Sequence, residues 1–158
     1  MPGQQPAPRR QKGQRDIMTV TAADDLRAKL IGSWTLQSHV SISTGGSDVV
    51  YPLGVDARGL IMYTPDGYMS AQLMRSDRTP FDRDGAGAGG YYNYAGPYIV
   101  VEDGLMAHHV EVSLRPDLIG ETLYRKAHLH DSTLELGPAE PILLDGELRN
   151  AKLVWRRT

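Results

Sequence analysis

The sequence predicts an all-β fold, a single up-and-down antiparallel β-barrel preceded by one short helix. After Gly32, apolar and polar residues alternate with a period of two to the end of the chain, as in strands that bury one face. The segments between the strands are short turns such as "PDG", "EDG" and "LDG", which suit hairpins. Only one helical segment is predicted, whereas a parallel sheet would need repeated crossover helices.

The elements follow in order along the chain. The segment "TAADDLRAKLIG" is predicted to be the helix, because Thr21 can cap it, Asp24 and Asp25 lie in the first turn where the helix dipole favours anions, and Gly32 ends it. The predicted strands are Ser33–Ser43, Asp48–Tyr51, Arg58–Thr64, Tyr68–Arg75, Tyr91–Glu102, Leu105–Leu114, Thr122–His130, Thr133–Leu136, Ile142–Leu144 and Leu148–Arg156. The Gly-rich segment Ser76–Gly90 is predicted to be a loop, either a lid at the barrel mouth or a plain insertion.

Composition limits the class of protein. A chain of 158 residues with 41% hydrophobic content is the size of one domain, which we expect over residues 19–158 after a disordered leader or tail at residues 1–18. The absence of cysteine excludes a thiolate nucleophile and disulfides. A formal charge of −2 argues against a nucleic-acid partner, and no apolar run suggests a signal peptide or a membrane span. We therefore expect a cytoplasmic protein.

Two motifs at the ends of the predicted barrel carry a family resemblance. "LIGSW", ending at Trp34, resembles the Gly-x-Trp signature of the calycin superfamily, and "LVWRR" brings Arg156 and Arg157 to the position from which those barrels place an arginine across the tryptophan. A guanidinium can stack on an indole and bind carbonyls at the closed end, so these residues are assigned a structural role.

The middle of the chain extends this resemblance. The segments "YPLGVDARGLIMYTPDGYMSAQLMRSDR" and "HHVEVSLRPDLIGETLYRKAHL" resemble the lipocalin-like domain family of bacterial and fungal proteins, over most of residues 26–157. The resemblance implies a barrel with a small-molecule pocket. It does not imply a reaction, because one fold supports many functions.

The hairpin around "TPDGYMSAQLM" offers two registers and two orientations. A type I turn with a Gly bulge pairs Tyr63 with Met69, whereas a two-residue turn pairs Tyr63 with Ser70. Hydrophobic burial favours the apolar alternate residues inward, but the opposite face is free of charge and suits a ligand cavity. The site hypothesis adopts this second orientation, with substrate contacts from Tyr68, Gln72 and Met74.

Two further strands place a titratable or charged residue on an otherwise apolar face. His108 is the best candidate for general acid–base chemistry, although a buried imidazole is also common in cores. Arg125 shares its face with alanine and leucine, and an unpaired buried charge is costly. It is therefore expected to meet either a ligand carboxylate or enolate, or a protein carboxylate such as that of Glu111. The predicted catalytic set is His108, Arg125 and Tyr63.

Tyrosines and further histidines supply the remaining candidates. The tyrosines of "YYNYAGPY" are either cavity-rim residues or ordinary strand formers, and Tyr98 is predicted to bind substrate at the rim beside the Gly-rich loop. His109 with Glu111 is either a base–carboxylate pair or solvated surface. His128 and His130 share a face, but no third ligand follows at a motif spacing, so no metal and no cofactor are predicted.

These observations support one leading function and two alternatives. The leading hypothesis is a cofactor-independent isomerase, cyclase or dehydratase of secondary metabolism that acts on an apolar, oxygenated substrate. The alternatives are a non-catalytic binding protein with the same cavity and a structural module with a filled barrel. The expected partner is a small hydrophobic or amphipathic ligand, without nucleic acid or membrane, and a homodimer is left open.

Overall fold

The computed structural model describes residues 20–78 and 89–158. The expected leader and the centre of the Gly-rich loop lie outside these residues. The elements are α1 (Ala22–Leu30), β1 (Gly32–Ser43), β2 (Val49–Val50), β3 (Arg58–Tyr63), β4 (Tyr68–Met74), β5 (Tyr91–Glu102), β6 (Leu105–His109), the 3₁₀ turn η1 (Pro116–Leu118), β7 (Thr122–His130), β8 (Thr133–Pro138), β9 (Ile142–Leu144) and β10 (Glu147–Arg157).

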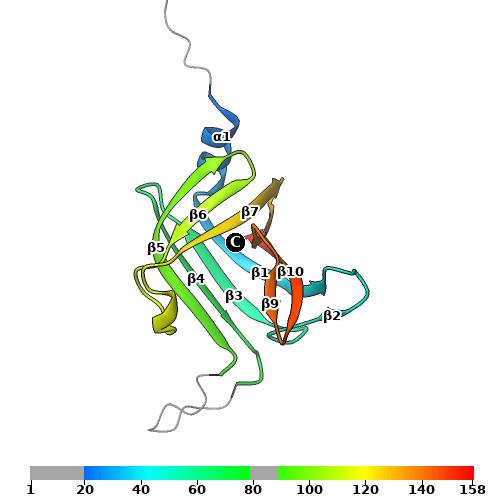
Figure 1. Ribbon diagram of the computed structural model, residues 1–158. Coiled ribbons are helices and arrows are strands. Elements are labelled where there is room, and N and C mark those ends of the chain that lie inside the picture. Colours follow the sequence, from blue (N-terminus) through cyan, green and yellow to red (C-terminus); the bar gives the residue numbers. More distant parts are fainter. Residues whose placement is uncertain (1–19, 79–88) are drawn as a thin grey trace, which may run out of the picture.

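The strands close into a barrel, as the sequence predicts. Antiparallel pairing runs in the order β1-β3-β4-β5-β6-β7-β8-β10, and β10 pairs again with β1. Eight strands within the described residues therefore form the closed sheet, while the short strands β2 and β9 extend β1 and β10 (Figure 1). Closure gives every barrel strand a barrel neighbour on both sides, so the interior is reached through the ends.

The helix covers one end of this barrel, beside β5 (Figure 1). Its N-terminus is a capping box, in which the Thr21 hydroxyl accepts from the Asp24 backbone N–H at 3.1 Å and the Asp24 carboxylate accepts from the Thr21 N–H. Leu26 and Leu30 are the buried residues of α1, and they join the barrel core. The spacing of four residues puts both on one helix face.

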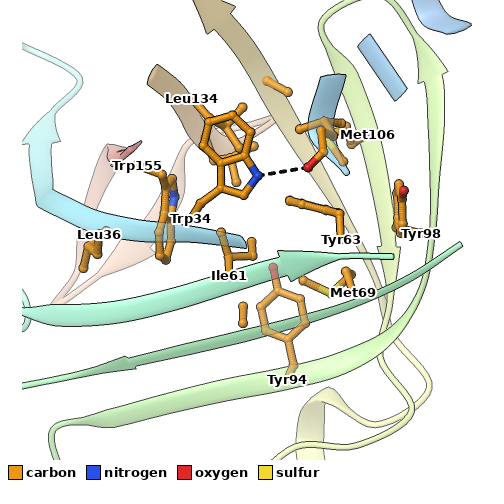
Figure 2. Packing of buried hydrophobic residues seen from close by; sticks show 14 of the residues in the cluster. Trp34, Leu36, Ile61, Tyr63, Met69, Tyr94, Tyr98, Met106, Leu134 and Trp155 are labelled. Carbon is orange, nitrogen blue, oxygen red and sulfur yellow. Dashed lines mark hydrogen bonds between the residues drawn. The ribbon is translucent and has the colours of Figure 1, made fainter. Parts of the chain in front are cut away.

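A tryptophan and an arginine seal the same end. Trp34 is fully buried, and its Nε1 donates to the Leu30 carbonyl at 2.9 Å, the dashed line in Figure 2. The guanidinium carbon of Arg157 lies 4.2 Å from the centre of the Trp34 ring, and the guanidinium donates to the carbonyls of Ile31 and Lys29. The predicted Trp–Arg contact is thus confirmed, with Arg157 as the partner.

The β3–β4 hairpin follows the register with the Gly bulge. Tyr63 pairs with Met69 and Ile61 with Ala71. The apolar face of β4 is the buried one, so the site hypothesis chose the wrong orientation for this strand: Tyr68 and Gln72 are exposed. Burial of three apolar side chains outweighs the absence of charge on the opposite face.

Strand β1 contains an irregularity that changes which residues point inward. Leu36 pairs with Trp155 but Ser38 pairs with Val154, so Gln37 is an extra residue. Such a bulge shifts the alternation by one. The inward set therefore changes from Trp34 and Leu36 to the odd-numbered residues His39, Ser41 and Ser43.

The predicted strand Leu105–Leu114 is shorter than expected, because β6 ends at His109. Beyond it, Val110 is fully buried but Val112 and Leu114 are exposed, and one isolated bridge joins Val112 to Ala95. The chain crosses β5 closely here: a Cβ on Gly96 would lie 2.0 Å from the His109 carbonyl oxygen.

Candidate functional site

A cavity of about 470 Å³ lies inside the barrel, toward the end opposite α1. This volume is within the range of small-molecule pockets. Most of its wall is aliphatic or aromatic, including Leu53, Ile61, Leu73, Leu123, Leu136 and Trp155. The polar contributions come from His39 on β1, Tyr92 and Tyr94 on β5, Arg115 near η1, and Arg125 on β7.

Arg125 is the half-buried cation of this wall. Its inward orientation follows from the alternation of β7, in which Ala127, two residues further on, is buried. Arg125 forms no ion pair with any carboxylate of residues 20–78 and 89–158, and Glu111 is exposed. Of the two alternatives for Arg125, the salt bridge to a protein carboxylate such as that of Glu111 is therefore absent among these residues. The guanidinium carbon lies 6.0 Å from the centre of the Tyr94 ring. By contrast, Arg115 is paired with Asp117.

His108 lies behind Tyr94 and does not itself line the cavity. It is completely buried, and both ring nitrogens have phenol partners: Nε2 is 3.2 Å from the Tyr63 hydroxyl and Nδ1 is 2.8 Å from the Tyr94 hydroxyl. Burial, and secondarily the positive charge of Arg125, lower the pKa of His108 to about 3. The imidazole is therefore neutral at physiological pH, with both nitrogens engaged.

The phenols around this histidine are neutral as well. Burial raises the pKa of Tyr63 well above its usual value and also raises the pKa of Tyr92 and Tyr94, although nearby Arg125 lowers each of them in part. Tyr94 reaches from β5 into the barrel (Figure 2). It touches both the cavity and His108, so it joins the buried histidine to the ligand space.

The structure separates the predicted catalytic residue Arg125 from the other two, His108 and Tyr63, and all three from Gln72, the predicted substrate contact that the site hypothesis places in the same pocket. Arg125 lines the cavity, whereas Tyr63 and His108 lie one layer behind it through Tyr94. Gln72 does not reach it, because its side chain is on the outer face and accepts from the Tyr91 hydroxyl at 2.6 Å.

The other predicted substrate contacts also lie outside the cavity. Tyr68 is 48% exposed, and Met74 is half-buried beside Gln72. Tyr98 is buried near the helix-covered end, where its hydroxyl donates to the Thr64 carbonyl at 3.1 Å, so its predicted place at the rim is wrong. The part of the Gly-rich loop at residues 79–88 lies outside the described residues.

The remaining histidine candidates are on the surface. The His109 ring is 3.3 Å from the Thr122 hydroxyl, and His128 and His130 are exposed. Within residues 20–78 and 89–158, no three His, Asp or Glu side chains gather as metal ligands would. In the same residues no helix is long and apolar enough to cross a membrane.

Sequence reasoning missed His39 and gave Tyr94 no separate role. The bulge at Gln37 turns His39 inward, and alternation counted from Trp34 would have placed it outside. His39 lines the cavity, burial lowers its pKa, and its Nδ1 is buried without a hydrogen-bond partner among the described residues. Tyr94 belonged to a tyrosine cluster whose members alternation alone could not rank.

Comparison with known proteins agrees with this architecture. No curated protein matches the chain. A comparison with protein families matches residues 31–158 to a lipocalin-like domain, a span that includes the ten strands of the described residues and every residue of the cavity wall. The chain therefore belongs to the lipocalin-like domain family.

Proposed function

We propose that this protein binds a small, largely apolar molecule inside its barrel. The observation that carries the proposal is the cavity of about 470 Å³, whose apolar wall contains one guanidinium, that of Arg125, without a carboxylate partner among the described residues. Apolar pockets with a few polar groups are typical of small-molecule sites. The unpartnered Nδ1 of His39 on the same wall is a second polar group that a ligand can use.

This proposal replaces enzymatic catalysis by His108 as the leading function. A general base must come within hydrogen-bond reach of the proton that it abstracts. His108 has no surface on the cavity, both its nitrogens are occupied, and its pKa of about 3 makes it a weak base. These properties suit a buried positioning residue better than an acid–base catalyst.

An isomerase, cyclase or dehydratase remains the second candidate, for one reason. Tyr94 presents a phenol to the cavity close to Arg125, and such a pair is able to stabilise oxyanion charge in a bound substrate. In this alternative Tyr94 takes the proton-donor role that the sequence had suggested for His108.

A neutral fluorescent probe tests the binding proposal. N-phenyl-1-naphthylamine is apolar and uncharged, so its affinity reports on the cavity rather than on the guanidinium. We expect saturable binding by the full chain, and a loss of at least about tenfold in affinity in Ala151→Phe, because Ala151 lines the cavity and the larger ring fills it.

The neighbouring substitution Lys152→Phe is the matched control. It adds the same ring on the same strand, but Lys152 is exposed on the outer face. Equal loss of affinity in both variants, or no saturable binding by the unmodified chain, contradicts the proposal.

A further inference from the structure

The hydrogen-bonded series Tyr63–His108–Tyr94 has a direction, because its two end phenols differ in their surroundings: Tyr94 lines the cavity, where water or a ligand can accept its proton, whereas Tyr63 does not. His108 is neutral, so one ring nitrogen carries hydrogen and the other accepts. Each phenol has a single proton to donate. The tautomer of His108 therefore decides which of the two phenols, Tyr63 or Tyr94, donates its proton to the imidazole.

Tyr63 decides between the tautomers. Its side chain is fully buried, and the hydroxyl has one hydrogen-bond partner among the described residues, Nε2 of His108. If Nε2 carried the hydrogen, the Tyr63 hydroxyl would accept it and its own proton would be buried without an acceptor. A buried donor without a partner is costly, so Tyr63 donates to Nε2 and the hydrogen of His108 is on Nδ1.

The consequence reaches the cavity through Tyr94. Nδ1–H then donates to the Tyr94 oxygen across the 2.8 Å contact. Because that contact no longer uses the Tyr94 proton, the phenol O–H is free to donate into the cavity that Tyr94 lines. The other tautomer would turn this O–H back toward His108.

Two donors then occupy the same stretch of wall. Arg125 presents guanidinium N–H groups, which can only donate, and it lies beside Tyr94. Tyr92 lines the same side of the barrel, and its phenol is neutral, because burial raises its pKa by more than nearby Arg125 lowers it. His39, with its unpartnered Nδ1, is on β1, three strands further round. The part of the cavity wall that contains Arg125 and Tyr94 is therefore suited to a ligand group that only accepts hydrogen bonds.

We propose that the cavity ligand is an amphipathic anion whose carboxylate or enolate oxygen receives hydrogen bonds from Arg125 and the Tyr94 hydroxyl, with Tyr63 and His108 acting as positioning residues. This inference rests on the proposed binding function and names the chemical class of its ligand. The apolar body of the ligand would lie against the aliphatic part of the wall.

The tautomer is tested first, on the ligand-free full chain. A long-range ¹H–¹⁵N correlation spectrum distinguishes the protonated from the unprotonated ring nitrogen of each histidine. The signals of His108 are identified because they disappear in the variant His108→Gln. We expect them to show the hydrogen on Nδ1. Hydrogen on Nε2 overturns the proposal, whatever the protein binds.

Ligand selectivity is tested with decanoate and decylamine, which share an alkyl chain but carry opposite charges. Each competes with N-phenyl-1-naphthylamine. We expect decanoate to bind at least about tenfold more tightly than decylamine, since donors face it and a cation meets like charge. Equal affinity, or preference for the amine, overturns the proposal.

The role of Tyr94 is tested by removing only its hydroxyl. In Tyr94→Phe the affinity for decanoate, divided by that for the neutral probe, is expected to fall about tenfold, whereas Tyr124→Phe, on an exposed tyrosine, leaves this ratio unchanged. An unchanged ratio in Tyr94→Phe overturns the proposal. Failure of the neutral probe to bind the unmodified chain would instead contradict the binding function, so the two failures are distinguishable.

Discussion

Burial of a neutral histidine makes the fold sensitive to mild acid, and the size of the effect follows from the pKa of His108. That pKa is about 3 in the folded protein, against an ordinary 6.5. Between these values the unfolded chain binds a proton that the folded chain does not. The contribution of neutral His108 to the free energy of unfolding is therefore fully present above about pH 6.5 and is lost progressively as the pH falls toward 3.

The loss at pH 5 can be worked out from these two pKa values. An unfolded histidine is protonated roughly 30:1 at this pH, which corresponds to about 2 kcal/mol taken from the free energy of unfolding. The groups that face His108 are Tyr63, Tyr94 and Arg125, and the phenols, with raised pKa values, do not titrate in this range. His39 also has a lowered pKa and adds loss of the same sign.

Urea unfolding at pH 7.5 and pH 5.0, followed by tryptophan fluorescence, measures the loss. His108→Gln supplies an amide with both a donor and an acceptor but no titrating proton, so its loss between the two pH values should be about 2 kcal/mol smaller. His39→Gln likewise removes the contribution of His39 to the loss of stability at pH 5.0. If His108→Gln leaves the pH dependence as it was, the assignment of a buried, acid-sensitive imidazole is refuted.

Two further predictions concern the frame of the barrel. Trp34→Ala should lower the free energy of unfolding by about 3–5 kcal/mol, because core packing is lost. Tyr124→Ala, which truncates an exposed side chain, should change it by less than about 1 kcal/mol. Chemical denaturation measures both. Gly96→Ala should lower the free energy of unfolding by about 3 kcal/mol or more, since its Cβ would lie 2.0 Å from the His109 carbonyl oxygen. A Cβ on Gly45 would meet nothing within 4 Å, so Gly45→Ala should be nearly neutral. Small and equal effects of both substitutions in thermal melts would contradict the close approach of Gly96 to His109.

The fold was predictable because its determinants are local. Period-two alternation and hairpin turns specify antiparallel strands, and the "PDG" turn gave the observed Tyr63–Met69 pairing as one of two registers. The contact of Trp34 with Arg157 is distant in sequence, and it was accessible only through resemblance to known barrels. No periodicity in the chain indicates which arginine meets which indole.

The site was less predictable because it depends on departures from the regular pattern. Alternation placed Arg125 and His108 inward, as observed, but it cannot indicate that Tyr94 stands between His108 and the cavity. The bulge at Gln37 reverses the face of His39 without any glycine or proline to mark it. For Gln72, the absence of charged residues on its face of β4 predicted an inward orientation, but burial of the apolar residues on the opposite face decided the orientation of the strand.

The pairing of β1 with β10 has a consequence for the way the protein is made. The ladder that closes the barrel joins the first of the described strands, β1, to the last, β10, so it cannot be completed on a ribosome until Arg157 has emerged. During that interval the unpaired edge of β1 can bind a strand of another chain. Loop closure over almost the whole domain also slows folding, into the millisecond-to-second range of barrels rich in non-local contacts.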